Sequence, residues 1–164
     1  MKLADLKYDF PENLIAIEPS RPTRVMWVEA KHNPVELNLQ QVIERIPAGD
    51  ILVINDTKVL KRRVFVDNLE ILFLDQLENN RWSVLFPSKK FSVGDQIQLP
   101  NGFKMKLIEK GLPQRVEISD ALTDDEFEKM AELPLPPYIQ KARDQRHNSK
   151  EDEAWYQTAW AEKP

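Results

Sequence analysis

Leu133-Pro134-Leu135-Pro136-Pro137-Tyr138-Ile139, near the C-terminal end of the chain, places three prolines among four large apolar side chains. Each proline fixes its own φ, removes a backbone donor and pushes the preceding residue toward extended geometry. We therefore expect this proline segment (residues 133–139) to be stiff and to pack on another part of the molecule. An alternative is a PxxP ligand for an SH3-type groove, although the flanking apolar residues favour burial.

The composition is that of a globular protein with one ordinary domain or two small ones. The 164 residues are 41% hydrophobic and 30% charged, with no cysteine and no apolar run long enough to cross a membrane. The N-terminus lacks the apolar core of a signal peptide. These features predict a cytoplasmic protein with no membrane partner.

The net charge of −4 argues against a protein whose whole surface attracts nucleic acid, so any RNA contact needs a local basic patch. On charge alone, solvated strand ends and turns explain the basic residues more simply. The candidates are Lys58, Lys61, Arg62 and Arg63, then Lys89 and Lys90, and finally Lys141, Arg143 and Arg146.

Several kinds of chemistry are disfavoured by the residues that the chain has. His32 and His147 are far apart in sequence and no cysteine accompanies them, so we expect no metal site. Each of the four glycines lies in a turn context, and none belongs to a phosphate-binding or dinucleotide-binding loop.

The first 62 residues have the pattern of a mixed α/β unit. Residues 24–28 predict a strand, and an apolar stripe from Leu39 to Ile46 predicts a helix that Asn38 and Gln41 cap reciprocally. Residues 51–54, Ile-Leu-Val-Ile, predict a strand buried on both faces. Polar residues just past the end of such a strand are favoured sites for ligand contact.

The middle of the chain changes to short β-prone runs divided by turns, which predicts a small antiparallel barrel or sandwich. After it, Thr123 and Glu126 form a capping-box pattern that opens a helix through Ala131. We expect a mobile polar loop over residues 140–153 and an aromatic strand over 155–160. The β-prone runs are Val64–Val66, Leu69–Leu74, Trp82–Phe86, Gln96–Leu99, Phe103–Ile108 and Arg115–Ile118.

Four segments, in their order and spacing, resemble the S-adenosylmethionine:tRNA ribosyltransferase-isomerase family of queuosine biosynthesis. The resemblance runs over the whole chain, and the proline segment and the Gly-Asp…Asn-Asp-Thr stretch are its more specific parts. The segments are residues 8–16, residues 47–59, the proline segment and residues 156–161.

The resemblance implies a fold that is α/β plus all-β: part of an α/β domain, interrupted by an inserted small antiparallel β-barrel. We expect residues 1–62 and 121–164 to form the α/β part, incomplete relative to the family, and residues 63–120 to form the barrel. The resemblance also implies an activity: transfer of the ribosyl group of S-adenosylmethionine, a co-substrate, to 7-aminomethyl-7-deazaguanine in tRNA, with loss of adenine and methionine.

The sequence also departs from the family pattern. Family members are about twice as long, and the remaining half would begin after Pro164. Lys58 stands where the family has Arg, which keeps the charge but loses bidentate phosphate recognition. Near the start, only Arg21 and Arg24 of an Arg-Asp…Ser-Arg-Leu-Leu stretch are kept, and Trp155 replaces an Arg.

Site residues follow from these matches. Asp56 is the candidate catalytic carboxylate, as base or acid, with Asn55 and Thr57 beside it. Arg24 and Lys58 are candidates for tRNA phosphate or the methionine carboxylate. The remaining candidates for substrate contact are Tyr138, which could stack on a base or instead anchor the proline segment in the core, and Tyr156, Gln157 and Thr158.

Two functional classes remain open. In the first, the chain is a queuosine-pathway transferase that is inactive alone and is active only if the missing half is supplied by a second chain or by a longer native product. Alternatively, it is a non-catalytic paralogue that acts as a tRNA- or protein-binding module. An unpaired sheet edge would separately favour a homodimer.

Overall fold

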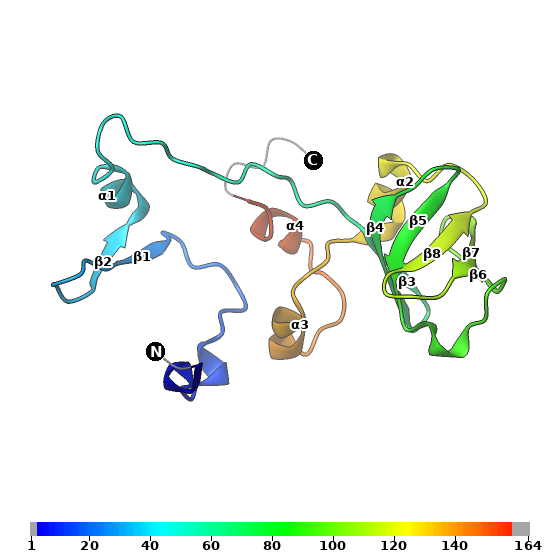
Figure 1. Ribbon diagram of the computed structural model, residues 1–164, viewed down its shortest axis with the longest axis horizontal. Helices are drawn as coiled ribbons and strands as arrows, with labels where there is room; N and C mark the ends of the chain where they lie inside the picture. The colour runs from blue at the N-terminus through cyan, green and yellow to red at the C-terminus, as the bar shows by residue number, and fades with distance from the viewer. Residues whose placement is uncertain (1–2, 159–164) are drawn as a thin grey trace.

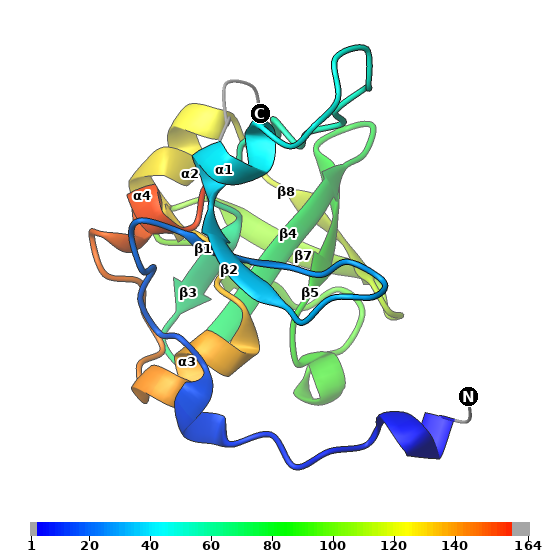
Figure 2. The same cartoon turned by 90° about the vertical axis from the view of Figure 1, so that its left-hand side faces the viewer.

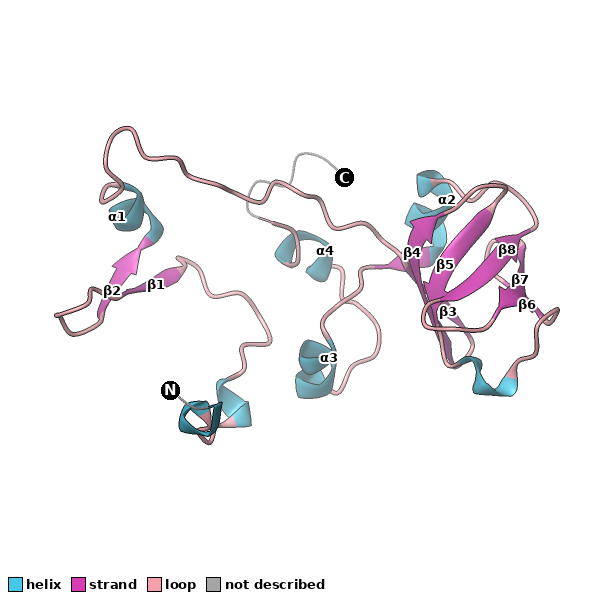
Figure 3. Ribbon diagram, in the orientation of Figure 1, coloured by secondary structure: helices cyan, strands magenta, loops and turns pink. Residues whose placement is uncertain are grey.

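The computed structural model describes residues 3–158, and most of its regular structure is antiparallel β-sheet. A two-stranded hairpin lies at one end and a seven-stranded sheet at the other, joined by an extended segment (Figure 1). Short helices lie between them and against the large sheet (Figure 3). The structure confirms a mixed fold of helix and sheet whose middle is all-β.

The N-terminal part contains a hairpin followed by one short helix. The predicted cap is present: Asn38 Oδ1 accepts from Gln41 N at 2.9 Å, and Gln41 Oε1 accepts from Asn38 N at 2.9 Å. The apolar stripe that follows is not covered, because Leu39 and Ile43 are 45% and 44% exposed. The elements are 3-10 helices η1 (Leu3–Leu6) and η2 (Glu12–Leu14), strands β1 (Arg24–Trp27) and β2 (Val35–Asn38), and helix α1 (Leu39–Ile43).

The large sheet has the strand order β6-β7-β8-β5-β4-β3-β9, and every neighbouring pair in it is antiparallel. Its first six strands in chain order coincide with the six β-prone runs expected from the sequence. The elements are β3 (Arg63–Val66), β4 (Leu69–Gln76), β5 (Arg81–Leu85), 3-10 helix η3 (Ser88–Lys90), β6 (Gln96–Gln98), β7 (Lys104–Glu109), β8 (Gln114–Ile118) and β9 (Ala131–Glu132).

One turn shows why this sequence forms hairpins. Asn79 and Asn80, between β4 and β5, have φ values of +58° and +56°. Two successive positive φ values match the twist of a hairpin, and Asn tolerates them better than most residues. The turn therefore fixes the register of the strands that carry the core.

Three aromatic rings form the centre of that core. Phe73, Trp82 and Phe127 pack edge to face, with centroids 5.1 to 5.6 Å apart. Phe127 comes from helix α2 (Asp124–Met130), whose first turn Thr123 caps by accepting from Glu126 N. Burying Phe127 holds α2 over the sheet, and such ring pairs add about 0.5–1.5 kcal/mol beyond burial.

Residues 51–54 do not form the expected buried strand. Ile51 and Val53 are 90% and 89% exposed, and the segment lies in the extended connection between α1 and the sheet. The prediction of a strand buried on both faces is therefore wrong for this chain, because no described element packs on either face.

The proline segment packs as expected in its first part. Leu133, Leu135 and Ile139 are 2%, 6% and 3% exposed, so the segment is not available as a PxxP ligand. It is not extended throughout, because Pro137 begins helix α3 (Pro137–Arg143), a position where its missing N–H costs nothing.

The C-terminal part differs from expectation in two further respects. The polar stretch after residue 140 completes α3, and hydrogen bonds then join Asn148 to Glu132 and Asp152 to Arg143. Helix α4 (Asp152–Trp155) replaces the start of the expected aromatic strand. Residues 156–158 are not in a strand, and residues 159 and 160, the end of the expected strand, lie outside the described residues.

Candidate functional site

Two segments about one hundred residues apart in the sequence meet at the candidate site. Gln157 Oε1 accepts from Val59 N at 2.8 Å, and Gln157 Nε2 donates to Val59 O at 3.0 Å. Thr158 Oγ1 donates to Thr57 O at 2.9 Å. These bonds join residues 57–59 to residues 157–158, and we call the contact the junction.

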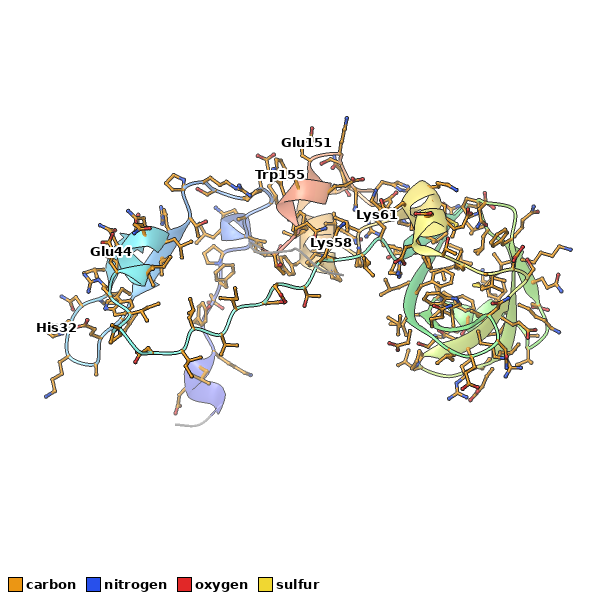
Figure 4. The ribbon with its side chains drawn as sticks, turned by 90° about the horizontal axis from the view of Figure 1, so that it is seen from above. His32, Glu44, Lys58, Lys61, Glu151 and Trp155 are labelled. Atoms are coloured by element: carbon orange, nitrogen blue, oxygen red, sulfur yellow. The ribbon has the colours of Figure 1, made fainter. Side chains whose placement is uncertain are left out.

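The residues before the junction form a local turn. Asn55 Oδ1 accepts from Thr57 N at 3.0 Å, the geometry by which Asn replaces a backbone turn. Asp56 and Lys58 are exposed and make no ion pair within residues 3–158. Figure 4 shows Lys58 on the extended segment that leads to the sheet. The turn therefore presents one carboxylate and one ammonium group to solvent beside the junction.

A buried ion pair lies behind the junction. Arg143 Nη1 donates to both carboxylate oxygens of Asp152 at 2.8 and 2.9 Å, and the two side chains are 9% and 0% exposed. The hydrogen bonds to Asp152 raise the pKa of Arg143 above its ordinary value. Arg143 also donates from Nε and Nη2 to the carbonyl of Ile17, at 2.9 Å for Nε. It thus ties the N-terminal segment to α3 and α4.

Tyr156 and Tyr138 lie around this ion pair. Tyr156 Oη accepts from Arg143 Nη2 at 3.4 Å. Burial raises the pKa of Tyr156 above its ordinary value, and Tyr138 lies close enough to add to that rise. Tyr138 itself is 56% exposed, so it is not the core anchor that was one of the two expectations for it.

Sequence reasoning did not single out Asp152 as a functional residue and treated its surroundings as mobile. A signal was present, since Ser149 and Asp152 have the spacing of a capping box. Asp152 Oδ2 accepts from Ser149 N at 2.8 Å, which stabilises the turn that leads into α4. That spacing predicts a helix start within the polar tail.

Most of the first candidate basic cluster is neutralised by acids. Lys61 Nζ lies 2.8 Å from Glu153 and 3.1 Å from Glu128, and the hydrogen bond to Glu153 is the main cause that raises the pKa of Lys61. Arg62 Nη2 lies 2.5 Å from Asp124, and its guanidinium stacks on Phe127. The run is therefore not a free phosphate-binding patch.

Arg63 is the most buried member of that cluster. Its side chain is 2% exposed, and Nη2 lies 3.2 Å from Glu132 Oε2 and 2.5 Å from Asn148 Oδ1. The N–H of Asn148 and His147 Nδ1 bind the same carboxylate. Burial raises the pKa of Glu132, but these partners outweigh burial and lower it overall. The group attaches residues 147–148 to the edge of the sheet.

Among residues 3–158, Arg24 makes no contact with the residues of the junction. It lies on β1, 74% exposed at its side chain, and its Nε is 3.4 Å from Glu36 on β2. The structure thus gathers residues 55–58 with Gln157 and Thr158, and Tyr138 with Tyr156, and leaves Arg24 on the hairpin.

Among the described residues, the chain has neither a membrane-spanning helix nor a cluster of metal-binding side chains. Across residues 3–158, no helix is long and apolar enough to span a bilayer. Over the same residues, no three His, Asp or Glu side chains are grouped so as to hold a metal ion.

Comparison with known proteins identifies the family. The family model described as "Queuosine biosynthesis protein" matches residues 3–164. The chain is 31% identical to S-adenosylmethionine:tRNA ribosyltransferase-isomerase of Parvibaculum lavamentivorans, covering 100% of this chain and 51% of that protein. For the protein of the same name from Staphylococcus aureus, the identity is 31% over 98% of this chain and 50% of the relative.

A solved structure, of S-adenosylmethionine tRNA ribosyltransferase from Thermotoga maritima, matches with 25% identity and a TM-score of 0.38 over 84% of this chain and 53% of that one. The chain spans about half the length of the curated relatives that it matches. On the match of the family model to residues 3–164, the chain belongs to the queuosine biosynthesis protein family.

Proposed function

We propose that this chain supplies the N-terminal part of an S-adenosylmethionine:tRNA ribosyltransferase-isomerase. The complete enzyme transfers the ribosyl group of S-adenosylmethionine to 7-aminomethyl-7-deazaguanine in tRNA, in the cytoplasm. The observation that carries the proposal is the junction, where the Asn55–Lys58 turn meets Gln157 and Thr158. These residues belong to two of the family-like segments. Hydrogen bonds join the two segments directly, although the residues of the large sheet separate them in the sequence.

The proposal includes a division into two domains. Residues 1–62 and 121–164 are assigned to the α/β domain and residues 63–120 to an inserted small β-barrel. The chain just after residue 120 still packs on that barrel, because Phe127 of α2 lies in its core and β9 pairs with β3. Support comes from the continuity of the sheet strands β3 to β8 along the chain and from the contacts between residues on either side of them. With this division, both sides of the junction belong to the α/β domain.

The reaction requires a base near the carbon beside the sulfonium and an acid for the departing adenine. The exposed Asp56 carboxylate takes one of these roles. Lys58 binds tRNA phosphate or the methionine carboxylate, with Asn55 and Thr57 beside it. Gln157 and Thr158 act by positioning, since their side chains are already bonded to the backbone of residues 57–59.

Activity requires more than this chain. The apolar side chains of residues 51–54 are 45–90% exposed, and an apolar strand without neighbours is a surface for pairing. We propose that a second chain, which supplies the remaining half of the enzyme, covers them and completes the site, and that Arg24 and Tyr156 contribute to it only then.

The test is adenine release from S-adenosylmethionine, measured by chromatography, in the presence of precursor tRNA. We expect no release by the chain alone, and release when the C-terminal half of the Staphylococcus aureus relative is added. Asp56→Asn should abolish release, whereas Asp67→Asn, in a hairpin turn of the sheet, should not change it.

No release with this half or with that of the Parvibaculum lavamentivorans relative would overturn the proposal. If the chain nevertheless bound precursor tRNA, a non-catalytic binding module would be the better description.

A further inference from the structure

A pocket of about 600 Å³ lies between residues 12–17 and helix α3. Its volume is within the range of small-molecule sites, about 300–1,000 Å³. Figure 2 shows η2 beside α3. The two walls come from opposite ends of the chain, so the tertiary fold creates the pocket.

One ion pair and one set of hydrogen bonds join the two walls. At the rim, Lys141 Nζ lies 3.1 Å from Glu12 Oε1. Behind the pocket, Arg143 binds the carbonyl of Ile17 while its own position is fixed by the buried carboxylate of Asp152. The second contact involves a buried charge with several partners, so it keeps the walls at a defined spacing.

The lining is suited to a flat heterocycle. Ile15, Ile17 and Ala142 supply apolar surface, and Tyr138 supplies a half-exposed aromatic ring at the pocket. Base–aromatic stacking requires an accessible ring face and contributes about 1–3 kcal/mol per base by alanine substitution. A ring that is 56% exposed at a pocket retains the area needed for this.

The polar lining favours adenine over a guanine-like base. Asn13 carries an amide, whose donor and acceptor match the N6 and N7 edge of adenine. The other polar side chains of the lining, Glu12 and Lys141, contact each other at the exposed rim, so Asn13 is the uncharged lining side chain that can bind a base edge.

We infer that this pocket binds the adenine ring of an adenosine compound, stacked on Tyr138 and recognised by Asn13. This inference deepens the proposed function by giving S-adenosylmethionine a place in the chain. The pocket adjoins the Arg143–Asp152 ion pair, which also contacts Tyr156, the residue next to the junction. A bound adenine therefore lies near the segments that carry the proposed chemistry.

The experiment uses the chain alone, without tRNA or a second half, and titrates adenosine, S-adenosylmethionine and free 7-aminomethyl-7-deazaguanine by NMR. We expect both adenosine compounds to shift resonances of residues 12–17 and 138–142. Tyr138→Ala should weaken binding about 10- to 100-fold, the loss of one base stack, while Tyr138→Phe should stay within about threefold.

Tyr8→Ala is the matched control, because Tyr8 is 78% exposed and lies outside the pocket. Asn13→Asp should reduce the preference for adenosine over the deazaguanine base. Absence of adenosine binding, shifts located elsewhere, or preference of the unaltered chain for the deazaguanine base would each overturn the inference.

The binding experiment can fail or succeed independently of the adenine-release test of the proposed function. Adenosine binding without adenine release would sustain the pocket and contradict the enzyme. Release that Tyr138→Ala leaves unchanged would sustain the enzyme and contradict the pocket.

Discussion

Gln157 holds the backbone of Val59 with both ends of its side-chain amide, which accepts from Val59 N at 2.8 Å and donates to Val59 O at 3.0 Å. An amide that bonds both polar groups of one residue imitates the pairing of a β-strand. The 57–59 segment is thereby fixed to residues 157–158, which follow α4, although the residues before it are exposed.

Gln157→Ala should release the junction, because two part-buried hydrogen bonds are lost at about 0.5–1.5 kcal/mol each. Hydrogen exchange at the Val59 amide measures this, and we expect it to accelerate while exchange in the sheet is unchanged. Gln157→Glu keeps the acceptor and should have a smaller effect. Gln98→Ala, on the exposed side of β6, is the control. Equal exchange in all variants would mean that the Gln157–Val59 hydrogen bonds contribute nothing to the junction.

Replacing Ile51 and Val53 together by serine should change the free energy of unfolding of the chain by no more than about 0.5 kcal/mol, as expected for exposed positions. Their side chains are 90% and 89% exposed. By contrast, Ile71→Ala, at a fully buried position, should cost about 2–5 kcal/mol. Urea denaturation gives both values, and a loss at residues 51 and 53 similar to that at Ile71 would show that the segment is buried.

Breaking the Arg143–Asp152 ion pair should be costly, because either single change leaves a buried charge without its partner. Arg143→Met and Asp152→Asn should each destabilise the α3–α4 region by about 3–5 kcal/mol, and the double variant should lose less than the sum. Hydrogen exchange at the α3 and α4 amides reports the loss.

Lys141→Met is the control for that pair, since its ion pair with Glu12 is 75–78% exposed and contributes at most about 1 kcal/mol. Strictly additive single effects would contradict a direct interaction between Arg143 and Asp152.

Acid should destabilise the attachment of residues 147–148 through Glu132. The folded state lowers the pKa of Glu132 below its ordinary value of 4.5. Its stabilising contribution is therefore complete above pH 4.5 and is lost as the pH falls through the folded-state pKa. Glu132→Gln should remove this part of the acid dependence in thermal unfolding measured from pH 7 to pH 3.

Glu78→Gln, at a turn carboxyl with no ion pair among residues 3–158, should leave the acid dependence as it is in the unaltered chain. A Glu132→Gln profile that coincides with the unaltered one would show that Glu132 does not govern this transition.

Local patterns were sufficient for several parts of the fold. The Asn38–Gln41 and Thr123–Glu126 spacings predicted two helix starts, because a capping side chain acts on its own turn. The alternation of residues 103–107 predicted β7, because side chains on a strand alternate between faces whatever lies beyond them. The order of the family-like segments likewise predicted the family.

Tertiary structure alone decided which apolar residues found partners and which charges remained free. Residues 51–54 carry the pattern of a buried strand, but burial requires neighbours, and none of the described elements supplies them. Lys61, Arg62 and Arg63 have the pattern of a basic patch, but acids from residues 124–153 neutralise them. Tyr138 and Asn13 have no joint pattern, because a pocket formed by residues more than a hundred positions apart exists only once the chain has folded.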